Sequence, residues 1–377
     1  ILVASASPVD QYVINHPEFL LDRSPEEARV DPDNLHVLLA HLRCAAFERP
    51  FEPGEVFGPG PADDLLAFLG EEGHVRQSSD GRWYWSSENF PASEVSLRAA
   101  APENVVIIDT TPDRPRVLGE VDLFSAQVLV HERAIYIHES VQFYVDRLEW
   151  GERKAYVHRV DVDHYTYANR AVTLKPLDVF GEEPATGGRR IHGEVMVASL
   201  VTLFKKLKFG TDENVGWGPI DLPELELQTT AYWVTADSAA AGWRRDDLDV
   251  ALVGVGRALQ AVAAVLLMVD PRDLGLVSQV RSPHQDAPTI YLYEAMPGGV
   301  GLSERLWARH EELVLGAAQL VMECPCDSGC PACTGPRLDP AVDAKALALR
   351  LLSALGSAIG ASAPSASRRT ASTKRVA

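Results

Sequence analysis

Four of the five cysteines lie within ten residues, and this cluster restricts the fold more than any other feature of the sequence. Cys324, Cys326, Cys330 and Cys333 have the spacing C-x-C-x3-C-x2-C. With Gly329 and two prolines bending the backbone, four thiolates can surround one tetrahedral ion at a sulfur distance of about 2.3 Å. Four unrelated buried thiols, or an iron–sulfur cluster, are alternatives. We predict one structural zinc ion, because a closed four-cysteine site at a helix end is the usual arrangement of structural zinc.

The length of the chain argues against a single compact core. Hydrophobic cores stop growing at roughly 250 to 300 residues, and this chain has 377. We therefore predict a multidomain α+β protein. Acidic residues outnumber basic ones by 53 to 35, and the net charge of −18 argues against a surface that coats nucleic acid everywhere. Any contact with a polyanion must be local.

The most apolar stretch runs from Leu248 to Val269, which is long enough to raise the question of a membrane span. Gly254 and Arg257 interrupt it. We therefore predict a buried helix and no membrane partner. Residues 1–5 lack the charged and long apolar regions of a secretory signal, which predicts a cytoplasmic protein.

The N-terminal quarter combines helical and hairpin patterns. Ile1 to Ala4 form a short β-type run without nearby partners, typical of the last strand of a preceding domain. Apolar periodicity predicts helices over 33–47 and 62–69. A hairpin is predicted around Asp80-Gly81. Helices followed by a hairpin favour a strap and winged helix over 16–90.

The rest of the chain divides into a β-rich part and a mixed part. Short β-type runs between turns predict a small β-barrel over 91–180; these are Val105–Ile108, Ala134–His138, Phe143–Leu148 and Ala155–Val160. Residues 181–360 alternate strand and helix patterns and predict an α/β zinc-binding domain, in which the helix 302–322 leads directly into Cys324. The tail, 361–377, is rich in Ser, Ala and basic residues, which predicts disorder.

Three segments together resemble one known family. They are the cysteine cluster, the segment 293–301 (YEAMPGGVG), and the N-terminal Asp10-Gln11-Tyr12 with His16-Pro17 and 24–28 (SPEEA). These segments resemble the C-terminal half of MrfA/SftH-type superfamily 2 DNA helicases, in which two RecA-like motor domains precede an accessory module with a four-cysteine zinc-binding domain. The resemblance implies that 1–15 are a remnant of the second motor domain and a linker.

Helicase motors need nucleotide-binding motifs, and this sequence lacks them. It contains no G-x-x-x-x-G-K-[ST], no D-E-x-H box and no Q-x-x-G-R-x-G-R motif. We therefore expect no ATPase activity from this chain alone, with ATP and Mg bound only in the missing motor domains. The resemblance implies an accessory DNA-engaging module of an ATP-dependent 3′ to 5′ DNA helicase or translocase in DNA repair.

The same resemblance implies the partners and the location. They are single-stranded DNA and the protein's own RecA-like motors, in a monomer of the bacterial cytoplasm that associates with the nucleoid when working. A stand-alone zinc-domain partner subunit of a separate helicase is the main alternative. A metal-dependent hydrolase that uses Asp161, Asp163 and His164 is a weaker one, because charged residues usually form a solvated strand end.

Two places can accept DNA. Lys205, Lys206 and Lys208, beside two phenylalanines, form the densest basic patch of the folded region, although a solvated polar face is an equal alternative. In the predicted wing, Arg76, Arg82 and Trp83 can reach a backbone or stack on a base. The basic tail residues would add only non-specific attraction; they are Arg368, Arg369, Lys374 and Arg375.

The remaining candidates have ordinary structural explanations. The glycine loop 297–301 opens a helix and can cradle a phosphate, but it lacks a lysine, so a tight turn beside the cysteines is the better interpretation. Histidines 131, 138 and 158 are predicted to be packed or superficial. Cys44 is predicted to be a small buried hydrophobe.

Overall fold

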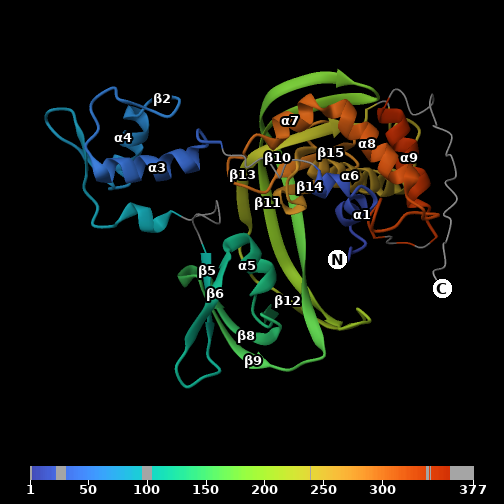
Figure 1. Cartoon of the computed structure of the whole chain (residues 1–377), viewed down its shortest axis with the longest axis horizontal. Helices are drawn as coiled ribbons and strands as arrows, with labels where there is room; N and C mark the ends of the chain where they lie inside the picture. Colours follow the sequence, from blue (N-terminus) through green and yellow to red (C-terminus); the bar gives the residue numbers. More distant parts are fainter. Residues whose placement is uncertain are drawn as a thin grey trace, which may run out of the picture.

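The computed structural model describes residues 2–22, 31–95, 104–237, 239–336, 339 and 341–356. These residues form a winged helix, a lower β-sheet unit with one helix, and an α/β unit, and a long hairpin joins the last two (Figure 1). The segment 24–28, the basic tail and residue 1 fall outside the described residues.

Two short helices begin the chain: α1 (Pro8–Asn15) and α2 (Glu18–Leu21). Ser7 caps α1, because its hydroxyl accepts a hydrogen bond from Asp10 N–H. Helix α1 lies against the α/β unit (Figure 1). Residues 2–5 belong to no strand, and Val3 is exposed. Among the described residues nothing pairs with this run, and the hypothesis that it is the last strand of a preceding domain stays a prediction.

The winged helix is built around a small apolar core. Its helices are α3 (Leu35–Glu48) and α4 (Asp63–Glu71), and its strands are β1 (Val56–Phe57), β2 (Gly60–Pro61), β3 (Val75–Gln77) and β4 (Trp83–Trp85). Leu42, Leu66 and Val75 are among its buried residues. Gly81 adopts a positive φ of 85° at the predicted turn between β3 and β4. A 3-10 turn, η1 (Pro91–Glu94), follows the hairpin.

The lower unit is an open sheet with one helix and not a closed barrel. Its strand order is β6-β5-β9-β8-β7, with β5 and β9 parallel and the other neighbours antiparallel. The elements are β5 (Asn104–Asp109), β6 (Arg116–Asp122), α5 (Leu123–Leu129), β7 (Ile135–His138), β8 (Val141–Glu149), η2 (Trp150–Glu152) and β9 (Lys154–Val160). The predicted strands are present, but β6 and β7 remain edges, so the barrel prediction is corrected to a half-barrel.

A long hairpin joins the lower and upper units. It consists of β10 (His164–Ala185) and β11 (Gly188–Lys208), which pair over their whole length with three irregularities in register. The predicted boundary at 180/181 falls inside β10. The two units therefore share one continuous pair of strands.

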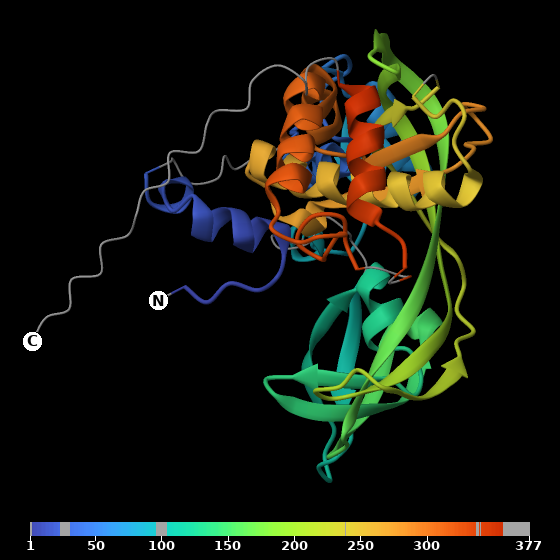
Figure 2. The ribbon, with the colours of Figure 1, turned by 90° about the vertical axis from the view of Figure 1, so that its right-hand side faces the viewer.

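The upper unit is an antiparallel sheet covered by helices on one face. The strand order is β10-β11-β13-β15-β14, and β12 pairs with the lower end of β11. The further strands are β12 (Asn214–Pro219), β13 (Leu225–Thr235), β14 (Leu274–Gln279) and β15 (Thr289–Glu294), with η3 (Pro271–Asp273) before β14. The helices are α6 (Arg245–Leu267), α7 (Leu302–Ala308), α8 (His310–Glu323) and α9 (Ala344–Leu355). Figure 2 shows them gathered on one side of the long strands.

Helix α6 is the central helix of this layer. The helix is long enough and apolar enough to cross a membrane. However, 61% of its most apolar 18-residue segment is buried inside the protein. Leu252, Val255 and Leu259 are completely buried in the main core, against the sheet and against α8 and α9. The prediction of a buried helix is therefore confirmed. The predicted helix over 302–322 is two helices, which meet at Arg309.

Candidate metal centre and nucleic-acid interface

The four cysteines lie where three helices meet. Cys324 is the C-cap residue of α8, as predicted, and the other three follow in the loop that leads toward α9. Cys333 is buried in the main core, and Thr334 packs against Gly254 of α6. The loop is therefore part of the helical layer, and the contacts of this layer position it.

The sulfur atoms form a compact group that fits a tetrahedral ion. The Sγ–Sγ distances are 3.5 Å for Cys324–Cys330, 3.6 Å for Cys326–Cys333 and 3.8 Å for Cys330–Cys333, and all four sulfurs lie within 4.8 Å of one another. Four sulfurs at about 2.3 Å from a central zinc ion would lie about 3.8 Å apart. The donor set and its spacing therefore fit zinc, and all four positions of a tetrahedral ion would be filled by protein.

Backbone groups fix the shape of the loop. The carbonyl of Cys330 accepts hydrogen bonds from the N–H groups of Cys333, Thr334 and Gly335, at 3.0 to 3.1 Å. Gly329 has a φ of 105°, and a Cβ there would lie 2.6 Å from the Thr334 hydroxyl. Only glycine satisfies both constraints.

Lys345 closes the loop from the first turn of α9. Its ammonium donates to the carbonyls of Cys324 and Cys326, at 2.6 and 3.0 Å. This ties two of the four cysteines to α9. The sequence did not reveal Lys345, because it lies in an apolar helix twelve residues beyond Cys333 and no motif includes it.

Burial and hydrogen bonds shift the pKa values of the thiols in opposite directions. Burial raises the pKa of Cys333 to about 12, and it also raises the pKa of Cys330. Burial acts in the same direction on Cys324, but hydrogen bonds from the Cys326 backbone and from the neighbouring thiols outweigh it and lower the pKa. A metal ion must therefore displace thiol protons when it binds, and its affinity depends on pH.

The glycine loop 297–301 is already occupied by a carboxyl group of the protein itself. Its glycines lie against Asn34, Thr230 and Glu294 and against no residue of the cysteine loop, so the expected position beside the cysteines is not found. Glu294, fully buried at the end of β15, accepts hydrogen bonds from Val300 N–H at 2.6 Å and from Ser303 N–H at 2.8 Å. The Thr230 hydroxyl donates to the same carboxylate at 2.7 Å. These are the donors that a phosphate would need. The loop is therefore a structural turn. Its glycines could be recognised in the sequence, but the Glu294 side chain that occupies the loop could not.

The three candidate lysines lie at the lower end of β11 but not on one face. Lys206 and Lys208 point to one side and Lys205 to the other, because side chains alternate along a strand. Lys205 and Lys208 are exposed and Lys206 is half-buried. The two flanking phenylalanines also differ, since Phe204 is buried and Phe209 is exposed. The sequence patch is therefore a pair of basic sites on opposite faces of one strand.

The wing residues have different environments. Arg76 is exposed on β3, opposite Tyr84. Arg82 forms an ion pair with Glu52 at 2.9 Å. Trp83 packs partly against the winged-helix core. Both arginines are exposed, but the guanidinium of Arg82 is engaged by Glu52.

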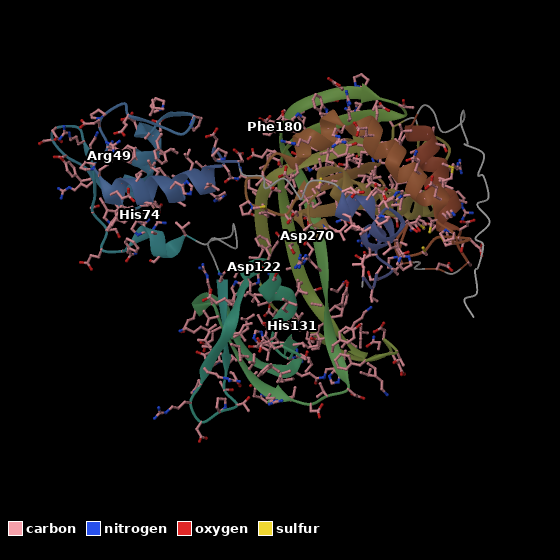
Figure 3. The ribbon with its side chains drawn as sticks, in the orientation of Figure 1. Arg49, His74, Asp122, His131, Phe180 and Asp270 are labelled. Carbon is pink, nitrogen blue, oxygen red and sulfur yellow. The ribbon has the colours of Figure 1, made fainter. Side chains whose placement is uncertain are left out.

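The hydrolase candidates do not converge on a site. His164 contacts Asp163 at 3.4 Å. Among the described residues, however, the cysteine cluster is the group in which three or more potential ligands meet. His158 lies on the surface beside Asp146, while His131 is fully buried in the lower unit (Figure 3). Cys44 is half-buried on α3.

Comparison with known proteins agrees with this architecture. The MrfA Zn-binding domain matches residues 255–334, and the winged helix domain of ATP-dependent helicase HRQ1 matches 30–100. The uncharacterized ATP-dependent helicase YprA of Bacillus subtilis is 44% identical over 353 residues, which cover 93% of this chain and 47% of YprA. Over 93% of its length the chain is thus similar to about half of a helicase of this type.

Two crystal structures of the DUF1998 helicase MrfA are similar to this chain. One has a TM-score of 0.65 at 37% identity and covers 93% of this chain and 48% of MrfA. The other, bound to DNA, has a TM-score of 0.57 at 43% identity and covers 93% and 47%. The chain thus spans about half the length of these MrfA-type relatives. The MrfA zinc-binding match begins inside α6 and ends at Thr334, so it contains all four cysteines and supports zinc over an iron–sulfur cluster.

Proposed function

We propose that this chain is the DNA-engaging accessory module of an ATP-dependent helicase, in which separate RecA-like motor domains supply the force. The observation that carries the proposal is the match of 93% of the chain to about half of MrfA, a helicase whose structure is known with bound DNA. The absence of Walker-type motifs from the sequence agrees with motors that lie outside this region.

The accessory module and the motor domains have separate tasks in this proposal. The module holds the tracking strand or splits the duplex, while the motors pull. The resemblance to MrfA-type proteins suggests 3′ to 5′ movement on single-stranded DNA during repair. The basic sites of β11 and Arg76 are the positions that we assign to the DNA backbone, because in a chain with a net charge of −18 phosphate must bind at local basic sites.

The zinc ion has a structural role in this proposal. Four thiolates leave no coordination position for water or substrate, so the site offers no Lewis-acid chemistry. Its contribution is to connect the end of α8, the loop against α6 and the first turn of α9, which Lys345 already joins.

The test uses the intact chain and a separately produced motor half. We expect the chain to bind single-stranded DNA in fluorescence anisotropy, to show no DNA-stimulated ATPase activity, and to increase unwinding when the motor half is added. ATP turnover that copurifies with the chain through stringent controls would overturn the division of labour. Failure to bind any DNA, alone or with the motors, would overturn the assignment of DNA contact.

A stand-alone partner subunit of a separate helicase is the second candidate, and the lack of ATPase motifs is the observation that favours it. The reading frame that precedes Ile1 distinguishes the two. Motor motifs in the same frame support a single polypeptide, and a separate motor gene supports a subunit.

A further inference from the structure

Three side chains form a row across the lower end of the long hairpin. Here β12 pairs with β11, and the register places Tyr167 of β10 opposite Lys205 of β11, and Lys205 opposite Trp217 of β12. Residues that lie opposite one another in antiparallel strands project from the same face of the sheet. Tyr167, Lys205 and Trp217, which we call the hairpin row, therefore stand side by side.

The hairpin row is open to solvent, whereas the reverse face of the same strands is covered. Trp217 is 71% exposed and Tyr167 58% exposed. On the reverse face, Phe204 and Ala168 are buried against Val128 and Ile220. Leu203 and Leu207, on the same face as Lys205, are half-buried, but the two exposed rings contribute little to the core.

We propose that the hairpin row binds single-stranded nucleic acid, with bases stacked on Tyr167 and Trp217 and a phosphate held by Lys205. This inference rests on the proposed function and specifies the DNA-contacting surface. Adjacent strands lie about 4.8 Å apart, so rings two strands apart are separated by about 10 Å. That distance is too long for the rings to stack on each other and leaves each ring free to take a base. Aromatic rings interleaved with a cation are the usual surface for single strands.

Neighbouring charges favour one path for the strand. Asp212 and Glu213 lie in the turn between β11 and β12, and the Tyr165 hydroxyl donates to Asp212 at 2.9 Å. Acidic groups at this turn repel phosphate. The strand therefore crosses the three β-strands along the row, toward Lys205, and avoids the turn.

A protein partner is the rival occupant of this face. A protein interface is expected to have a continuous apolar centre depleted of lysine. In the hairpin row, a lysine occupies the centre between two separate rings. This arrangement favours nucleic acid, and the rival is distinguished by experiment.

The experiment compares ring-deleting variants with a matched control. Trp217→Ala and Tyr167→Ala are made in the full chain. Phe180→Ala is the control, because Phe180 is also an exposed ring of β10, 56% exposed, but lies at the opposite end of the hairpin (Figure 3). Binding of an oligo-dT strand and of a duplex of equal length is measured by anisotropy at several salt concentrations.

We expect each ring deletion to weaken oligo-dT binding about tenfold, with an unchanged salt slope, because stacking involves no counterion release. Trp217→Phe should restore most of the affinity, and duplex binding and Phe180→Ala should be unaffected. Lys205→Ala should instead reduce the salt slope by about 0.7.

The outcomes separate the two proposals. Oligo-dT binding that survives both ring deletions would overturn the hairpin row and leave the proposed function intact. A chain that binds no DNA would overturn both. Unchanged DNA binding together with lost association with the motor half would assign the row to protein docking and refute its role with nucleic acid.

Discussion

Asn34 offers a sharp test of how the winged helix is held against the zinc-binding unit. Its side-chain oxygen caps α3 by accepting hydrogen bonds from His36 and Val37 N–H. Its side-chain nitrogen donates to the carbonyls of Pro297 and Gly299, both at 2.9 Å. One residue, 7% exposed, thus starts a helix and connects it to a loop more than 260 positions away.

Two substitutions separate these roles. Asn34→Ala removes the cap, worth about 1 kcal/mol, and both donated hydrogen bonds, worth about 1 kcal/mol each, so about 3 kcal/mol in total. Asn34→Asp keeps the cap acceptor but places a carboxylate against two carbonyl oxygens. It should lose about 2 kcal/mol from the missing hydrogen bonds, together with a further electrostatic cost.

Hydrogen exchange of α3 and of the loop 297–301, with a distance label across the two units, is the assay. Both variants should loosen the contact between units, and only Asn34→Ala should fray the start of α3. Asn15→Ala is the control, because its side-chain hydrogen bond is exposed and stays within α1. Equal fraying in both Asn34 variants, or an unchanged inter-unit distance in Asn34→Ala, would refute the reasoning.

Three further predictions follow from buried groups. Burial lowers the pKa of His131 and of His310 in the folded protein. Below about pH 6.5 the unfolded chain therefore binds more protons than the folded one, and acid lowers the free energy of unfolding. We expect a decrease of up to about 1.4 kcal/mol per pH unit for each histidine, measured by urea titration. Glu294→Gln keeps one acceptor oxygen but places its NH2 group against one of the two N–H donors, which should cost about 1 to 3 kcal/mol in the same assay, with no gain of phosphate binding. Cys333→Ser should lose zinc by elemental analysis and expose the 324–335 loop to proteolysis while the winged helix stays folded, whereas Cys44→Ser should retain one zinc per chain.

The sequence predicted best where a pattern is local. The four cysteines lie within ten residues, the Asp80-Gly81 turn forms as expected, and the helices over 33–47 and 62–69 appear almost unchanged as α3 and α4. Each of these depends on spacing within about ten to fifteen residues.

The predictions failed for elements whose partners lie far away in the sequence. Strand β10 was not predicted as one element, because Pro176 and Gly181 interrupt its pattern and three register irregularities shift its alternation. The parallel pairing of β5 with β9 joins segments about fifty residues apart, and no local signal reveals it. Helix α9 is absent from our predictions, although it carries Lys345. The exposed positions of Tyr167 and Trp217 became visible only when the register aligned them.

The hairpin links the two functions assigned to this chain. The upper part of β11, from Arg190 to Ser199, pairs with β13 beneath the helical layer, and the lower part, from Leu203 to Leu207, pairs with β12 beside the hairpin row. A Cβ on Gly193 would lie 2.1 Å from the Asp178 carbonyl, so the two strands fit closely at one of the register irregularities. The cysteine loop belongs to the helical layer of the upper unit, where it contacts α6 and α9. Zinc held there would order this layer and not the strands at the lower end of the hairpin. Loss of zinc should therefore disturb the helical layer first, and DNA binding at the hairpin row should persist until the sheet itself loses its covering helices.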